Sequence, residues 1–136
     1  MFKKMLFCLF CFSFFPVHIV AEEAATEEVN YYEYLLIDPD IITNYDKQGK
    51  RIGYIRVSVE LMAKSSTNYA LLARHEPLIR DKIITILGEQ SEDMVKSIAE
   101  RENIRLRCLN EINAMLSTPT VNNPLADLLF TKYLYE

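Results

Sequence analysis

Apolar and polar side chains alternate along the chain between Ile52 and Met62. Four aliphatic side chains fall on one face of this stretch: Ile55, Val57, Val59 and Leu61. A period of two predicts a β-strand with one buried face. Burial of each of these side chains would contribute about 1.5 to 3 kcal/mol, which fixes the register of the strand against a slip of one residue. Another apolar element must therefore cover this face.

A period close to that of an α-helix follows the strand. The predicted buried stripe consists of Leu72, His75, Ile79, Ile83 and Ile86. Their spacing lines one side of a helix, which Gly88 is expected to end. Because Pro77 lies inside the stretch, either the helix begins near Glu76 with the proline in its first turn, or it begins near Asn68 and is kinked. We favour the long kinked helix.

A second helix is predicted from Ser91 onwards. The Ser91 hydroxyl can accept a hydrogen bond from an exposed backbone amide, and Glu92 and Asp93 lie at the positive end of the helix dipole. The apolar stripe of this helix consists of Val95, Ile98, Leu106, Leu109, Ile112 and Leu116. A break in the helix is expected near Asn103.

Two further stretches predict strands before and after these elements. The segments Tyr32 to Ile37 and Ile41 to Tyr45 flank Asp38-Pro39-Asp40, which is expected to bend the chain. Gly49 is expected to supply the hairpin turn into the strand described first. The apolar and aromatic segment Leu125 to Tyr135 is expected to close the sheet. The prediction is a small α+β domain in the order strand, strand, helix, helix, strand, with helices on one face of a mostly antiparallel sheet.

The last strand is apolar on both faces. One predicted face holds Leu128, Phe130 and Leu134, and the other holds Leu129, Tyr133 and Tyr135. At an exposed edge of the sheet such a strand would invite pairing with another chain. A central position in the sheet would explain the same pattern equally well.

Four stretches of the chain, taken in order, match the pattern of a known family. They are TNYDKQGKRIGYIRVSVELM, HEPLIRDKIITILGEQSEDM, LRCLNEINAMLSTPT and the terminal LLFTKYL. The most telling pieces are Pro77-Leu78-Ile79-Arg80-Asp81, Ile112-Asn113 and Leu129-Phe130-Thr131. Together they resemble the FliL family of flagellar basal-body-associated proteins, over about Tyr32 to Tyr135. Order and spacing carry the resemblance, since no single piece is specific.

This resemblance implies a fold similar to the stomatin and prohibitin domain, in a protein beside the flagellar motor. It implies association with the torque-generating stator units, self-association into a ring, and support of flagellar rotation and of chemotactic or swarming motility. It implies a scaffold without a cofactor, and not an enzyme. The competing hypothesis is a periplasmic adaptor of the same fold in an envelope complex unrelated to flagella.

The first residues have the layout of a secretory signal peptide. Lys3 and Lys4 precede an apolar run from Met5 to Phe15, and cleavage is expected after Ala21. The run of eleven residues is shorter than the roughly 20 that a spanning helix needs. Members of the resembled family ordinarily keep a transmembrane anchor, so an uncleaved anchor is the alternative. In both cases the lysines keep the amino terminus cytoplasmic, which places the rest on the periplasmic side of the inner membrane.

Removal of residues 1–21 would leave a mature chain of 115 residues, which fits one domain. It would carry 13 basic and 19 acidic residues, a formal charge of −6 compared with −4 for the whole chain. This charge argues against nucleic-acid binding, which needs a basic surface. Four glutamates crowd residues 22–30, which we predict to be an acidic linker before a domain at residues 31–136.

The mature chain offers few groups for catalysis or metal binding. Cys8 and Cys11 lie in the leader, and the remaining Cys108 is expected to be a buried small hydrophobe, with an intermolecular crosslink as the alternative. His18 is also lost, and His75 is expected at the edge of the core with a local hydrogen bond. The alternative for His75 is a pH sensor at an interface. No catalytic, cofactor-binding or metal-binding residue is predicted, because one histidine and one cysteine suffice neither for a nucleophile with its triad nor for a structural zinc site.

Arg80, Asp81 and Phe130 are the candidate interface residues. Arg80 and Asp81 are adjacent on the predicted helix, so they cannot face one another and each needs another partner. They would form either two separate salt bridges or a polar part of a subunit contact. The three arginines between residues 101 and 107 are typical of a solvated helix face.

Overall fold

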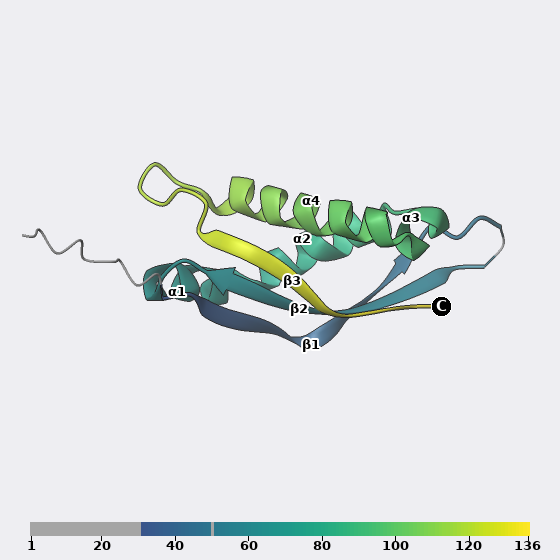
Figure 1. Ribbon diagram of the computed structural model, residues 1–136, viewed down its shortest axis with the longest axis horizontal. Coiled ribbons are helices and arrows are strands. Elements are labelled where there is room, and N and C mark those ends of the chain that lie inside the picture. Colours follow the sequence, from purple (N-terminus) through teal and green to yellow (C-terminus); the bar gives the residue numbers. More distant parts are fainter. Residues whose placement is uncertain (1–30, 50) are drawn as a thin grey trace, which may run out of the picture.

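Three antiparallel strands form a single sheet in the computed structural model of the chain (Figure 1). The structure describes residues 31–49 and 51–136, so the predicted leader and acidic linker lie outside the described residues. The elements are β1 (Glu33–Tyr45), β2 (Gly53–Ala63), α1 (Ser66–Arg74), α2 (Glu76–Gly88), α3 (Glu92–Lys96), α4 (Ile98–Leu116) and β3 (Leu125–Tyr135). The strand order is β1-β2-β3, with β2 in the centre.

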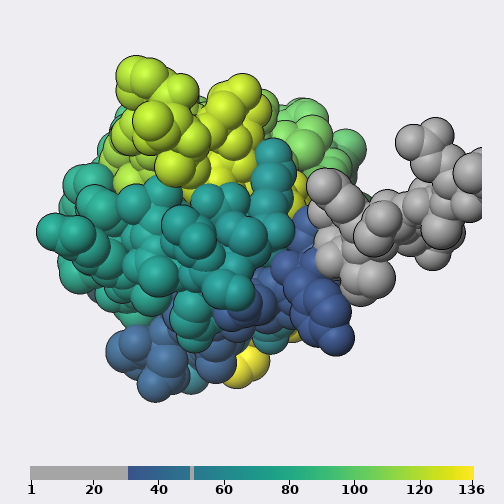
Figure 2. Space-filling view, turned by 90° about the vertical axis from the view of Figure 1, so that its left-hand side faces the viewer, coloured from purple at the N-terminus to yellow at the C-terminus, as the bar shows by residue number. Residues whose placement is uncertain are grey.

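The two longest helices, α2 and α4, lie on one face of this sheet (Figure 1). α2 packs on β1 and α4 on β3. The alternating side chains of β2 are buried beneath them, as the period of two predicts. α1 packs on β1 and β2, and Figure 2 shows it in teal below the yellow-green loop at residues 117–124. The predicted α+β fold and the order of its elements are confirmed, although each predicted helix is divided in two.

The first division lies at His75, so the long kinked helix predicted for this region is wrong. Ser65 caps α1 by accepting a hydrogen bond from the backbone N–H of Asn68 at 3.2 Å. Pro77 lies in the first turn of α2, where a missing N–H leaves no hydrogen bond unmade. The alternative that places Pro77 in the first turn of its own helix is therefore correct.

The second division lies at Ser97 and not near Asn103. Ser91 caps α3 as predicted, accepting from the N–H of Met94 at 3.4 Å. Ser97 has an extended backbone and accepts from the N–H of Glu100 at 3.3 Å, so it starts α4 as a second cap. Serine followed three residues later by glutamate is the spacing of a capping box, and this signal locates the break. Asn103 lies inside α4.

The hairpin has the predicted bend and turn. β1 passes through Asp38-Pro39-Asp40 as one strand, with a shift in register between Ile37 and Ile41 and a cis peptide bond before Pro39. Gly49 has a φ of 121°, in the left-handed region that favours glycine.

The strict alternation predicted for β3 is wrong, because its register with β2 shifts twice, between Ser58 and Val59 and between Met62 and Ala63. Each extra residue in β3 reverses the face on which the following side chains lie. The helix-side residues of β3 are Leu125, Leu128, Phe130, Tyr133 and Tyr135. Leu129, Lys132 and Leu134 lie on the other face.

Candidate interaction surfaces

β3 forms one edge of the described sheet, which confirms the exposed-edge interpretation over a central position. α4 covers this edge at Leu125, the first residue of β3. The Nδ2 of Asn113 donates to the carbonyl of Leu125 at 2.9 Å, and the Oδ1 of Asn113 accepts from the N–H of Leu125 at 3.0 Å. One side chain thus makes both hydrogen bonds that a neighbouring strand would otherwise make. Asn113 is only 8% exposed, and a buried amide requires such partners.

Arg105 of α4 covers the edge further along β3. Its Nη1 donates to the carbonyl of Leu128 at 2.9 Å and also pairs with the carboxylate of Asp127. Its Nη2 and Nε donate to Glu102 at 2.6 and 2.8 Å. The bonds to Glu102 and then to Asp127 raise the pKa of Arg105 above its ordinary value. Asn113 and Arg105 together close the first half of the β3 edge.

The second half of β3 has no such cover among the described residues. Tyr54 and Glu136 exchange two backbone hydrogen bonds, of 2.9 and 3.4 Å. Because hydrogen-bonded and non-bonded residue pairs alternate along antiparallel strands, this pair shows which residues of β3 bond to β2. Phe130, Tyr133 and Tyr135 therefore point their backbone N–H and C=O groups away from β2. Another strand could bond to these groups.

A groove of about 360 Å³ lies along this edge, between β3 and α4. Its lining consists of Ile98, Arg101, Glu102, Arg105, Leu129 and Phe130. Ile98 is 81% exposed. The guanidinium of Arg101 lies 4.4 Å from the ring centroid of Tyr133 in a cation–π contact, yet it forms no ion pair with a described residue. Phe130 packs against Tyr133 on the helix side of the sheet, with 5.7 Å between their ring centroids.

β1 forms the opposite edge, and Arg80 ties α2 to it. Its Nη1 donates to the carbonyl of Pro39 at 2.8 Å, and its Nε donates to Glu76 at 2.8 Å. Asp81 is exposed, and its carboxylate has no ion pair within residues 31–49 and 51–136. The structure therefore places Arg80 and Asp81 on the side of β1 and Phe130 on the side of β3. The three candidates do not form one site, and their role in an interface stays a prediction.

The face of the sheet opposite the helices carries exposed apolar side chains from all three strands. Those more than half exposed are Tyr34, Leu36, Ile42, Tyr54 and Leu134. No described helix covers this face (Figure 1). Apolar side chains gathered on one uncovered face indicate a surface for contact with another molecule.

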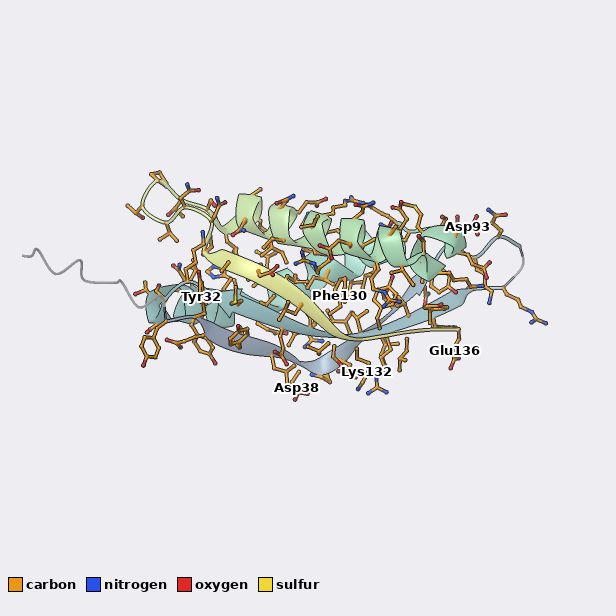
Figure 3. All side chains as sticks on the ribbon, in the orientation of Figure 1. Tyr32, Asp38, Asp93, Phe130, Lys132 and Glu136 are labelled. Carbon is orange, nitrogen blue, oxygen red and sulfur yellow. The ribbon has the colours of Figure 1, made fainter. Side chains whose placement is uncertain are left out.

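An ionic cluster lies in the middle of this face. Asp40 accepts hydrogen bonds from the Oγ of Ser58 at 2.5 Å, the Nε of Arg56 at 2.7 Å and the Nζ of Lys132 at 3.2 Å. These bonds, with that of Ser58 first, lower the pKa of Asp40 to about 2. Lys132 points away from the helices (Figure 3). Asp40 thereby ties the bend of β1 to both other strands.

Replacement of Asp40 by asparagine should lower the Tm at neutral pH. The Tm of the variant should also fall less than that of the wild type when the pH is lowered into the acid range. The pKa of Asp40 falls from 3.8 to about 2 in the folded protein. A lowered pKa contributes stability that is complete above the ordinary pKa and is lost as the pH falls through the folded value. The Tm difference between the two proteins should thus be constant above about pH 5, shrink as the pH falls from about 4 to 2, and vanish only by about pH 1.

Circular dichroism melts across this range measure the difference. Asp38→Asn is the matched control, because Asp38 is exposed and has no ion pair among the described residues. A Tm difference for Asp40→Asn that does not shrink in acid would contradict the role given to this carboxylate.

His75 and Cys108 have the local roles predicted for them. The Nδ1 of half-buried His75 lies 2.9 Å from the carbonyl oxygen of Leu71. Cys108 is a fully buried free thiol, and burial raises its pKa to about 12. This confirms the interpretation of Cys108 as a small buried hydrophobe. Within the described ranges, no three histidine, cysteine, aspartate or glutamate side chains are grouped as metal ligands.

The fold and these surfaces define a small α+β domain with a half-open sheet edge at β3 and one apolar sheet face that no described helix covers. Comparison with models of known protein families matches residues 34–135 to FliL, the flagellar basal body-associated protein FliL. The chain belongs to this family. It is 28% identical over 100 residues to the flagellar protein FliL of Aquifex aeolicus (strain VF5), in an alignment that covers 74% of this chain and 59% of that protein. The chain thus spans about three fifths of the length of this curated relative.

The family predicted from the sequence is confirmed. None of the helices within the described ranges has both the length and the apolar character that crossing a bilayer requires. Sequence reasoning missed the bonds of Asn113, the stacking of Arg101 and the cluster around Asp40. For Asn113 a signal was available, because this polar residue directly follows Ile112, which belongs to the apolar stripe of the helix.

Proposed function

We propose that this protein supports the torque-generating stator units of the flagellar motor, and through them rotation and chemotactic or swarming motility. Membership of the FliL family supports a place at the basal body. The observation that carries the proposal further is the uncovered sheet face, which exposes Leu36, Ile42 and Leu134 to contact by another protein. The protein acts as a scaffold that binds its neighbours and catalyses no reaction.

The protein acts on the periplasmic side of the inner membrane. Lys3 and Lys4 ahead of an apolar run support export of everything that follows. Fusion of alkaline phosphatase to the carboxyl end should give an active reporter, since this enzyme needs an oxidising compartment. The mass of the purified protein shows whether cleavage occurs after Ala21. An inactive reporter at normal expression would overturn this location.

Copies of the protein associate into a ring around the periplasmic part of the stator. The open half of the β3 edge supports self-association, because unpaired strand edges pair readily with other strands. An exposed apolar face on each copy would give the assembly many equivalent contacts to its partner, and such repetition strengthens weak binding.

Deletion of the gene should reduce spreading in soft agar and the number of labelled stator units at each motor. The wild-type gene and Asn110→Ala, an exposed position on α4, should restore both. Leu36→Asp should restore neither fully, because it places a charge on the uncovered face without entering the core. Deleted cells that swim normally with a full set of stator units would contradict the proposal.

A further inference from the structure

We propose that the open half of the β3 edge binds a short extended segment of a different protein, which carries an acidic side chain for Arg101. The inference rests on the scaffold role proposed above and names one surface and the kind of partner that it fits. The partner segment would add a strand beside β3. In this mode of binding, backbone hydrogen bonds hold the segment and side-chain contacts select it.

The backbone of β3 limits where such a segment can bind. Asn113 and Arg105 already bond to the first half of the edge. In the second half, the outward N–H and C=O groups belong to Phe130, Tyr133 and Tyr135, and no described residue bonds to them. The segment is therefore short and confined to the end of the strand.

A segment paired with this half of β3 directs alternate side chains into the groove between β3 and α4. Paired residues of neighbouring strands share a face, so the residue opposite Tyr133 points toward the helices, as Tyr133 does. The groove of about 360 Å³ exposes Ile98 and Phe130. An aliphatic side chain two positions along the segment lies on the same face and can cover this apolar surface.

Arg101 determines the charge that the segment should carry. Its guanidinium lies 4.4 Å from the ring centroid of Tyr133, and its buried Nε has no hydrogen-bond partner in the described part of the chain. The other charges of the groove are matched, because Arg105 bonds to both Glu102 and Asp127. One unmatched positive charge thus lies beside the residue that the segment would face. An aspartate or glutamate opposite Tyr133 would form a charge-assisted hydrogen bond with it.

A second copy of this chain would need the same outward groups, so a copy and the partner segment exclude one another at this edge. Pairing of two β3 edges would bring Arg101 of both copies to one place, where like charges repel. An acidic segment instead neutralises Arg101. The partner segment is therefore the better occupant of this half of the edge.

Selection from a library of random short peptides displayed on phage tests the predicted chemistry. The protein, produced from the full 136-residue sequence, is immobilised as wild type, as Arg101→Glu and as the control Asn110→Ala, an exposed position on the same helix. We expect the wild type and the control to enrich an acidic residue with an aliphatic residue two positions away. Arg101→Glu should enrich lysine or arginine at the acidic position. Peptides of the same charge from all three proteins would overturn the proposal.

The affinity of the selected peptide, synthesised and measured by calorimetry, tests the backbone contact. Tyr135→Pro removes one outward N–H, and Tyr135→Ala is the matched control that keeps it. In proteins with unchanged circular dichroism, we expect a loss of about tenfold for proline and of less than about threefold for alanine. Exchange of the acidic residue of the peptide for lysine should weaken binding to the wild type about tenfold and restore binding to Arg101→Glu.

Amide NMR spectra locate the bound peptide. The signals of Phe130, Tyr133 and Tyr135 should shift, and their exchange with solvent should slow. Shifts confined to Leu36 and Ile42 on the uncovered face, or equal affinity for the proline and alanine variants, would overturn the proposal. The motility and stator experiments use none of these variants, so they decide the scaffold role independently.

Discussion

Replacement of Asn113 by alanine should lower the free energy of unfolding by about 2 to 5 kcal/mol, since it leaves two buried backbone groups without partners. Asn113 makes both hydrogen bonds to Leu125, at 2.9 and 3.0 Å, from within the interface of α4 and β3. Water cannot readily replace the amide, because Leu125 is 1% exposed. In the variant, the N–H and C=O of Leu125 would be buried without hydrogen bonds, so the full free-energy cost of their desolvation would lower the stability.

Urea denaturation followed by circular dichroism measures the loss. Asn110→Ala is the matched control on the same helix, because Asn110 is exposed, and it should change stability by less than about 0.5 kcal/mol. Asn113→Asp keeps an acceptor but loses the donor to the carbonyl of Leu125, so it should also be destabilised. An Asn113→Ala protein as stable as Asn110→Ala would show that the strand does not depend on this side chain.

The elements that could be predicted are those in which one periodic pattern runs unbroken over a buried face. β2 keeps a period of two from Gly53 to Ala63, so its dry face was correctly predicted. Ser91 begins a helix as predicted, because a serine cap acts only on the amides that follow it. In both cases the cause lies within a few residues of the effect.

The faces of β3 could not be predicted, because the two shifts in register belong to the pairing of β3 with β2 and leave no mark on a local pattern. Phe130 and Tyr133 were predicted on opposite faces but lie on the same face, because β3 has one extra residue opposite β2 between them. The break at Ser97 is different, since its capping box was visible and a weaker interruption near Asn103 was preferred to it.

The surfaces depend on contacts between distant parts of the chain. Arg80 and Phe130 belong to motifs that carry the family resemblance, yet they lie toward opposite edges of the sheet. Arg101 was expected to be a solvated charge, whereas it stacks on Tyr133 from a strand that begins more than twenty residues later. Sequence spacing can place a residue on a face of its own element, but which elements meet at that face is decided by the whole fold.

Substitution of Gly53 by alanine should be the most destabilising change in the hairpin, lowering the free energy of unfolding by about 2 to 4 kcal/mol. Gly53 pairs with Tyr45, whose buried ring lies where a Cβ on Gly53 would stand. The Tyr45 hydroxyl also donates to the main-chain oxygen of Glu136 at 2.8 Å. A methyl group at Gly53 must displace the ring, and the displaced ring would give up both its packing and this bond between the hairpin and the end of β3.

Chemical denaturation of three variants separates this overlap from a general effect of replacing glycine. Gly88→Ala is the matched control, because a Cβ there meets only the carbonyl oxygen of Asn44 at an ordinary 3.7 Å and Gly88 has no positive φ. It should be neutral or stabilising by up to about 1 kcal/mol, since alanine favours a helix over glycine. In a Tyr45→Leu background the loss from Gly53→Ala should fall by more than half, because the smaller side chain can make room. Equal losses from Gly53→Ala in both backgrounds would mean that the tyrosine ring is not what requires glycine at this position.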